Sequence, residues 1–330
     1  MSNLEAAPAE VACSASQTAG IEVLHPREVP LGGPRAIPVQ RTLPQRHRSL
    51  IGAWCFLDHY GPVTGPAARM DVPPHPHTGL QTVSWLFSGE VEHRDSAGVH
   101  AIVRPGELNL MTAGAGICHS EVSLQSGSDS VLHGAQLWVA LPDAARHTGR
   151  DFAHYAPEPT ALPGAQARVF LGKLAGSRSP AHTFTPLLGA QIDLEPSAAL
   201  DIDIDIDQAF LHGVLCDAGE IEIGKTALAV GDLGYQGPGR TTPHLANAGV
   251  QPGRVLLLGG PPFTEELVMW WNFVGRNHDE IVTYRQLWQA RDERFGAVTG
   301  YQGTLARLPA PPLPATRLLP RQVSNRKDAE

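Results

Sequence analysis

The chain has 330 residues, 42% of them hydrophobic and 18% charged, which suits two domains of ordinary size and excludes wholesale disorder. The formal net charge is −8 and no basic stripe crosses the folded part, which argues against direct nucleic-acid binding. No apolar run approaches the roughly 18 residues of a membrane span, and no secretory signal is evident, so we expect a cytoplasmic protein without a membrane partner. The four cysteines have no CxxC spacing, which excludes a disulfide framework and a zinc ribbon.

Residues 1–20 are rich in Ala, Ser and Glu, and we expect them to form a flexible N-terminal tail. Alternating apolar and polar residues follow, interrupted by Gly and Pro about every ten residues, which is the pattern of a sandwich or barrel. The clearest predicted strands of the first half are Gln81–Phe87, Val91–Asp95, Val99–Val103 and Leu132–Leu141.

The second half repeats the pattern of the first. Turns at Gly89-Glu90 and Gly106-Glu107 in the first half correspond to turns at Gly219-Glu220 and Gly231-Asp232 in the second, which indicates an internal duplication. The sequence therefore predicts an all-β fold of two β-barrels, with a few short helices near the C-terminus. The predicted parts after the N-terminal tail are a first domain (21–152), a linker (153–165), a second domain (166–302) and a Pro-rich tail (303–330).

The helical signals lie near the C-terminus. Thr264 is a capping-like residue at the start of the segment Thr264–Val268. A second segment begins at Asn277, a predicted N-cap, and has apolar residues at helical spacing. These apolar residues are Ile281, Tyr284, Leu287 and Trp288.

Two pairs of metal-ligating residues lie in the first predicted barrel. His75 and His77 would project to the same face of a strand, and so would His119 and Glu121, because side chains two residues apart share a face. Three histidines and a glutamate without cysteine argue against structural zinc and favour one divalent first-row metal that keeps open positions. Iron, manganese, copper, nickel and catalytic zinc all remain compatible with these ligands.

Six blocks of the sequence carry a recognisable pattern: Phe56–Pro62, His75–Thr82, Glu92–Ser96, Met111–Glu121, Val268–Gly275 and Asn277–Ile281. These blocks resemble the pirin family of the cupin superfamily. The resemblance covers residues 20 to 300 and implies a bicupin, with iron in the N-terminal barrel held by His75, His77, His119 and Glu121. Some pirins cleave the flavonol quercetin with dioxygen, and others are regulators that bind transcription factors or metabolic enzymes.

One position departs from the cupin pattern. Many cupins carry Glu four residues after the second histidine of the first pair, where this chain has Gln81. Because the carboxylate of pirins comes from the second pair, we expect metal binding to survive, with an altered hydrogen bond to His77 as the consequence.

The second barrel is expected to be structural and metal-free. Asp205 and Asp207 fall at the positions of the first histidine pair, but their run is more simply a strand with one solvated face. His244 falls at the position of His119, yet Ala246 stands where a glutamate would be required.

Other polar and aromatic residues have simpler interpretations. Cys118 is expected to point away from the metal as a buried thiol. His93 and His100 are expected to be surface or hydrogen-bonded histidines, although His93 can border the cavity. Asp58-His59 is assigned to a loop that closes the first barrel, and Trp270-Trp271 to a core between the domains.

These inferences favour a metal-dependent dioxygenase of the quercetin 2,3-dioxygenase type, with a flavonol-like substrate and dioxygen. Glu121 is the candidate base that takes the substrate proton. One alternative is a non-enzymatic, metal-bound regulator that binds a transcription factor or metabolic enzyme. Another is a bicupin that binds a metabolite without catalysis.

Overall fold

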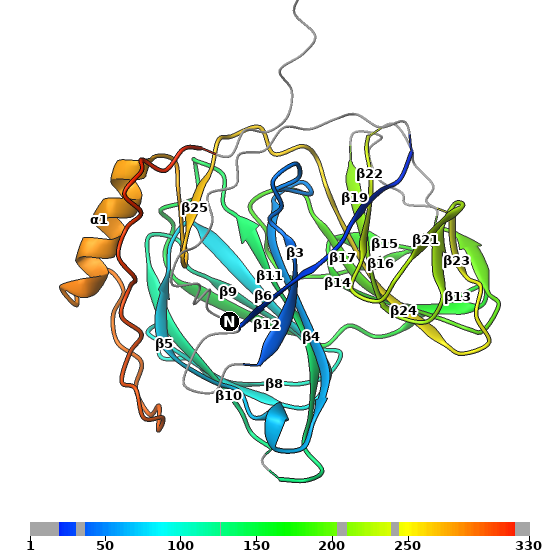
Figure 1. The fold of residues 1–330 in the computed structure, drawn as a ribbon, viewed down its shortest axis with the longest axis horizontal. Coiled ribbons are helices and arrows are strands. Elements are labelled where there is room, and N and C mark those ends of the chain that lie inside the picture. The colour runs from blue at the N-terminus through cyan, green and yellow to red at the C-terminus, as the bar shows by residue number, and fades with distance from the viewer. Residues whose placement is uncertain (1–19, 31–36, 126, 203–209, 239–243, 321–330) are drawn as a thin grey trace, which may run out of the picture.

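The structure is a computed structural model, and it describes residues 20–30, 37–125, 127–202, 210–238 and 244–320. Two β-barrels lie side by side, and helix α1 (His278–Gln289) lies against the first barrel on the side away from the second (Figure 1). The predicted all-β fold of two β-barrels is confirmed. Within the described ranges α1 is the one α-helix, where a few short helices were expected. It is too short and too polar to span a membrane, and no other described helix spans one either.

The first barrel consists of two antiparallel sheets. The larger has the strand order β12-β9-β6-β11-β4-β3-β2, and the smaller has the order β5-β10-β7-β8. A short 3₁₀ helix, Gly65–Ala68, follows β4. The strands are β2 Arg27–Pro30, β3 Pro38–Leu43, β4 Trp54–Thr64, β5 Asp71–His77, β6 Leu80–Ser88, β7 Val91–Asp95, β8 His100–Val103, β9 Leu108–Thr112, β10 Ile117–Ser123, β11 Val131–Ala140 and β12 Asp151–Tyr155.

The second barrel repeats this architecture, with sheet orders β1-β22-β19-β24-β17-β14-β13 and β18-β23-β20-β21. β19 takes the place of β6, β22 that of β9 and β24 that of β11, which agrees with an internal duplication. A small hairpin, β15 (Lys173–Leu174) with β16 (Ser177–Arg178), is added to this barrel. Its other strands are β1 Glu22–Leu24, β13 Thr160–Leu162, β14 Ala165–Leu171, β17 Leu188–Leu194, β18 Ala199–Asp201, β19 Leu211–Ala218, β20 Ile221–Ile223, β21 Thr226–Leu228, β22 Leu233–Gln236, β23 His244–Asn247 and β24 Gly253–Gly260.

The barrels exchange edge strands. β1 precedes the first barrel in the sequence but pairs with β22 of the second. In the same way, β12 directly precedes β13 and β14 of the second barrel in the sequence but pairs with β9 of the first. The predicted first domain, 21–152, thus contains a strand of the second barrel, and the predicted linker, 153–165, contains paired residues. The chain passes between the barrels at 156–159.

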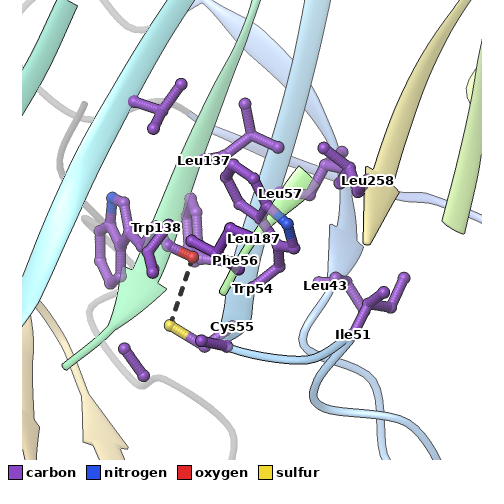
Figure 2. Packing of buried hydrophobic residues seen from close by; sticks show 14 of the residues in the cluster. Leu43, Ile51, Trp54, Cys55, Phe56, Leu57, Leu137, Trp138, Leu187 and Leu258 are labelled. Carbon is purple, nitrogen blue, oxygen red and sulfur yellow. Dashed lines mark hydrogen bonds between the residues drawn. The ribbon is translucent and has the colours of Figure 1, made fainter. Parts of the chain in front are cut away.

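A continuous apolar core joins the two barrels. Leu57 and Leu137 of the first barrel belong to the same buried cluster as Leu187 and Leu258 of the second (Figure 2). Trp54 Nε1 also crosses the junction and lies 3.2 Å from two backbone oxygens of the second barrel. Because this core is apolar and buried, removing it from water stabilises the two barrels as one body.

The barrels also approach each other closely through their backbones. Gly52 has a φ of +56°, and a Cβ at this position would lie 2.7 Å from the Cα of Gly260. Both the left-handed conformation and the lack of space therefore require glycine at position 52.

The C-terminal segment packs on the first barrel. Hairpin β25 (Val268–Trp270) and β26 (Phe273–Gly275) leads into α1, whose Asn277 side chain accepts a hydrogen bond from the amide of Glu280. The helix predicted from Asn277 is confirmed, and Ile281, Tyr284 and Trp288 form its buried face. Residues 303–320 of the predicted tail continue along the same barrel, where the amide of Leu308 donates to the carbonyl of Pro74.

Two expectations for this segment are wrong. Thr264–Val268 contains no helix, because Val268 already begins β25. Trp270 and Trp271 do not lie between the barrels, but in a cluster with Cys118 of β10 and with Trp288 of α1. The hairpin carries these two rings under the helix, so they fill the core between the first barrel and the C-terminal segment.

Candidate metal centre

The two predicted ligand pairs lie on neighbouring antiparallel strands. His75 and His77 end β5, and His119 and Glu121 lie in β10, with His75 directly opposite His119. The pairing is irregular beyond this point, because Glu121 is opposite Val72. The extra residue of this bulge falls in β5, where two consecutive prolines lack the amide donors that a regular ladder needs.

Three imidazoles converge inside the barrel. One ligand atom each from His75, His77 and His119 lies within 4.8 Å of the others, and all three side chains are fully buried. Their ring centres are 4.2 Å apart for His75 and His119, 5.0 Å for His77 and His119, and 5.1 Å for His75 and His77. Glu121 forms a second, overlapping group with His119 and His93. His119 therefore connects the three-histidine cluster to the carboxylate.

Hydrogen bonds at Nδ1 orient the first two imidazoles. His75 Nδ1 donates to the carbonyl of Pro73 at 2.9 Å, and His77 Nδ1 donates to the carbonyl of Asn272 at 3.1 Å. The second contact exists because β26 docks on the end of β5, where the amide of Val274 donates to the carbonyl of Thr78. Both bonds leave Nε2 as the atom with a free lone pair, as in many metal-bound histidines.

His119 is oriented by a chain of two further residues. Its Nδ1 lies 3.4 Å from His93 Nδ1, and His93 Nε2 lies 3.2 Å from Asp95 Oδ2. If His119 Nδ1 donates to His93 and His93 Nε2 donates to Asp95, every atom in the chain has one consistent role. Asp95 is itself fixed, because Oδ1 accepts hydrogen bonds from the amides of Ala97 and Val99.

Polar side chains from the larger sheet surround Glu121. The Ser84 hydroxyl lies 2.9 Å from Gln136 Oε1 and 3.4 Å from Glu121 Oε1. Burial, and then the negative charge of Glu121, raise the pKa of Tyr60, so its phenol stays protonated at neutral pH. The carboxylate thus lies among neutral groups that can donate hydrogen bonds.

The donor atoms fit a divalent first-row metal. Burial, and then the neighbouring imidazole of His77, lower the pKa of His75 well below its ordinary value, and the pKa of His119 is lowered for similar reasons. Burial likewise lowers the pKa of His77, so all three imidazoles are neutral at neutral pH, which is the form that binds metal. Their buried Nε2 atoms have no hydrogen-bond partner in the part of the chain that the structure describes. A cation bound between them would satisfy all three nitrogens, which burial otherwise leaves unpaired at a cost.

Comparison with known proteins identifies the family. The family model Pirin matches residues 36–139, and the model of the pirin C-terminal cupin domain matches residues 190–296. A pirin-like protein of Caulobacter vibrioides is 35% identical over 264 residues, which cover 76% of this chain and 88% of that relative. The chain belongs to the pirin family.

Two similar proteins are named for an activity. A Pseudomonas aeruginosa protein, provisionally named as a quercetin 2,3-dioxygenase, is 44% identical to this pirin over 291 residues, 87% of this chain and 89% of the relative. The crystal structure of a quercetin 2,3-dioxygenase from Acinetobacter baumannii has a TM-score of 0.83 and 36% identity. The match covers 90% of this chain and 97% of that protein.

Gln81 has a different role in this pirin from the one expected. Its amide nitrogen lies 2.9 Å from Thr112 Oγ1 and 3.3 Å from the carbonyl of His182, whereas His77 is oriented by Asn272. Gln81 lies on the same face of β6 as Trp85, whose Nε1 donates a hydrogen bond to Gln191 of the second barrel. Gln81 therefore does not orient His77.

The structure also corrects or supports the simpler assignments. Asp58 and His59 do not lie in a closing loop but in the middle of β4, from which they contact Arg41 and Asp217 respectively. Cys118 is buried away from the imidazoles, among aromatic rings, and burial raises the pKa of its thiol to about 12. An inert thiol is consistent with this environment.

The described core of the second barrel is an apolar cluster, although buried His212 lies on the face of β19 that also carries Val214 and Cys216. The counterpart of Glu121 is Leu245 and not Ala246, because Leu245 is opposite Ile223 in the same way as Glu121 is opposite His93 in the first barrel. His244 is exposed and pairs with Asp201 at the surface. Asp205 and Asp207 lie outside the described residues, so the expectation of a metal-free second barrel stays a prediction.

His93 is a hydrogen-bonded histidine beside the ligands, as expected, but sequence reasoning missed its role as a support and missed the other supporting residues. His93 and Asp95 have the i, i+2 spacing of the ligand pairs, which was a signal that these two side chains share a face of their strand. Ser84 and Gln136 carry no such signal, because single polar residues in apolar strands are common. Asn272 acts through its backbone carbonyl, which no side-chain pattern reveals.

Proposed function

We propose that this pirin is a cytoplasmic, metal-dependent dioxygenase whose substrates are flavonol-like compounds such as quercetin. The observation that carries the proposal is the cluster of three neutral imidazoles with buried Nε2 atoms, next to Glu121. Similarity to the Acinetobacter baumannii quercetin 2,3-dioxygenase supports it. We propose one divalent ion, iron by family resemblance, with His75, His77, His119 and Glu121 as its ligands.

The proposed reaction assigns distinct tasks to the surrounding residues. A bound divalent ion would supply Lewis acidity toward an enol or phenolic oxygen of the substrate, which activates the deprotonated substrate toward dioxygen. Glu121 would accept the proton of the substrate hydroxyl at a carboxylate oxygen. The Ser84 hydroxyl, 3.4 Å from Glu121 Oε1, would orient that carboxylate. The His93–Asp95 chain would hold His119 in its ligating tautomer.

The activity can be tested by anaerobic purification, metal analysis and measurement of oxygen uptake after quercetin is added. We expect about one equivalent of first-row metal and rapid oxygen uptake, both lost in His75→Ala because a required ligand is missing. The matched control is His100→Ala, a half-exposed histidine that pairs with Glu92, and it should behave as the wild type. Bound metal without oxygen uptake would contradict the proposal and favour a metal-bound regulator.

The base role of Glu121 has its own test. Glu121→Gln keeps an oxygen ligand of the same size but cannot take up the substrate proton. We expect the variant to retain metal while kcat falls by roughly 100-fold or more, which is the usual contribution of a general base. Metal content and turnover measured on the same preparation separate the two effects. Full turnover with metal bound would show that another group takes the proton.

A further inference from the structure

A second group of metal-ligating side chains lies at the junction of the barrels. His59 on β4 and His133 on β11 come from the first barrel, and Asp217 on β19 comes from the second. Nε2 of each histidine lies 2.7 Å from the same Asp217 oxygen, Oδ1. The three residues are 2%, 6% and 4% exposed, respectively. None of them takes part in the centre inside the first barrel.

The backbone directs the carboxylate toward the two imidazoles. Cys216 is opposite Val255 of β24 and Ala218 is opposite Arg254, so Asp217 between them is the extra residue of a β-bulge. Bulges commonly redirect a side chain next to a functional site. Arg254 Nε donates to the other carboxylate oxygen, Oδ2, at 2.5 Å, and its guanidinium lies 4.2 Å from the ring centre of Phe87. This support leaves Oδ1 facing the histidines.

Hydrogen bonding within the group leaves one nitrogen unsatisfied. His59 Nε2 forms a hydrogen bond with Asp217 Oδ1. His133 Nε2 is just as close, but it lacks hydrogen-bond geometry and has no other partner among the described residues, although it is fully buried. An unpaired buried nitrogen costs free energy. A cation between the three atoms would satisfy both nitrogens and the oxygen.

We propose that His59, His133 and Asp217 form a second site for a divalent transition metal, best matched by zinc, that links the two barrels. Two imidazoles and one carboxylate are ligands that zinc accepts, with a water molecule in the fourth position. Arg254 supports the ligating carboxylate through its second oxygen, as groups around metal ligands commonly do. Because the guanidinium adds positive charge beside the ion, this site binds zinc more weakly than the centre inside the barrel.

The experiment uses the full chain, stripped with EDTA and titrated with zinc chloride by calorimetry. The double variant His75→Ala/His119→Ala breaks both ligand groups inside the first barrel, and we expect it to bind one equivalent of zinc. Adding His133→Gln should weaken this binding by at least about tenfold, because one of three protein ligands is lost. The control is His154→Gln in the same background, a half-exposed histidine 3.6 Å from Glu107, which should leave the zinc affinity unchanged.

The double variant keeps the wild-type residues of the junction, so its zinc binding is a test that does not depend on the folding of a junction variant. If the double variant binds no zinc, His59, His133 and Asp217 are a hydrogen-bonded joint and the proposal is wrong. Unchanged zinc affinity after His133→Gln would also overturn it, because the ion would then lie elsewhere. If circular dichroism shows that His133→Gln does not fold, His59→Gln replaces it with the same expected loss. Zinc should also raise the thermal midpoint of the double variant but not of the triple variant.

Discussion

At the scale of single residues, the three imidazoles of the metal centre are held from three directions. His75 is fixed by a carbonyl of its own strand, His77 by the C-terminal segment and His119 by His93. Each contact occupies Nδ1 and leaves Nε2 pointing inward. The centre is therefore organised by its supporting residues before any ion binds, which lowers the cost of assembling the ligands.

His93 is a positioning residue, and its removal should be felt in metal affinity. His93→Leu keeps the volume but removes the acceptor for His119 Nδ1. We expect metal affinity to fall by about 10- to 100-fold, the usual effect of losing such a support. Competition with a chromophoric chelator measures this change. The control is His100→Leu, at an exposed site on the neighbouring strand β8.

A purely structural role for His93 would give a different result. His93→Asn places a carbonyl oxygen near the lost acceptor and should restore part of the affinity. If both variants bind metal as tightly as the wild type, His119 does not depend on His93 for its orientation. If the affinity falls equally in both, the lost interaction is not the hydrogen bond at Nδ1.

How far the sequence predicts this site depends on which interactions are local. The i, i+2 pairs were readable because the spacing alone places His75 and His77, or His119 and Glu121, on one face. The position of His93 depends on register, since it is opposite Glu121 in the pairing of β7 with β10. Register is set by contacts between strands, and a single sequence does not display them.

At the scale of elements, the predictions that rest on local signals were correct, and those that depend on tertiary contacts were not. Helix α1 has a local cap at Asn277 and a buried stripe, so both its existence and its start were predictable. Thr264 also resembles a cap, but the residues after it are drawn into tertiary contacts. Glu265 Oε2 accepts hydrogen bonds from Arg276 and from the amide of Asp143, and Val268 enters a hairpin. Tertiary contacts therefore overrode a weak helix signal.

The exchanged edge strands show a further limit of sequence patterns. β1 has three residues and β12 has five, and neither carries enough alternation to reveal which sheet it joins. Only the pairing of β1 with β22 and of β12 with β9 assigns them. Each exchanged strand covers an edge that would otherwise expose unpaired backbone groups.

At the scale of the whole molecule, the barrels are joined by apolar, covalent and polar links at once. The exchanged strands tether them, the shared core around Leu57 and Leu258 buries apolar surface, and Asp217 forms a polar joint with His59 and His133. Because the metal centre also depends on the C-terminal segment through Asn272, residues beyond the second barrel in the sequence contribute to the site in the first.

The polar joint makes the stability of the molecule depend on pH in a defined direction. Burial alone would raise the pKa of Asp217, but the imidazoles of His133 and His59 and the charge of Arg254 hold it well below its ordinary value. A lowered pKa means that the ionised carboxylate stabilises the fold above its unfolded pKa of about 3.9, and that this contribution is lost as pH falls through the folded value.

Asp217→Asn tests this linkage by urea unfolding with EDTA present, so that no metal contributes. At pH 7 we expect the variant to lose about 3 kcal/mol, because Arg254 is left without its buried partner. The loss should be the same at pH 5 and shrink only below about pH 4, as the wild-type carboxyl is protonated. Asp201→Asn, on an exposed aspartate paired with His244, should change little at any pH. A difference that already disappears near pH 6 would instead assign the dependence to protonation of the histidines.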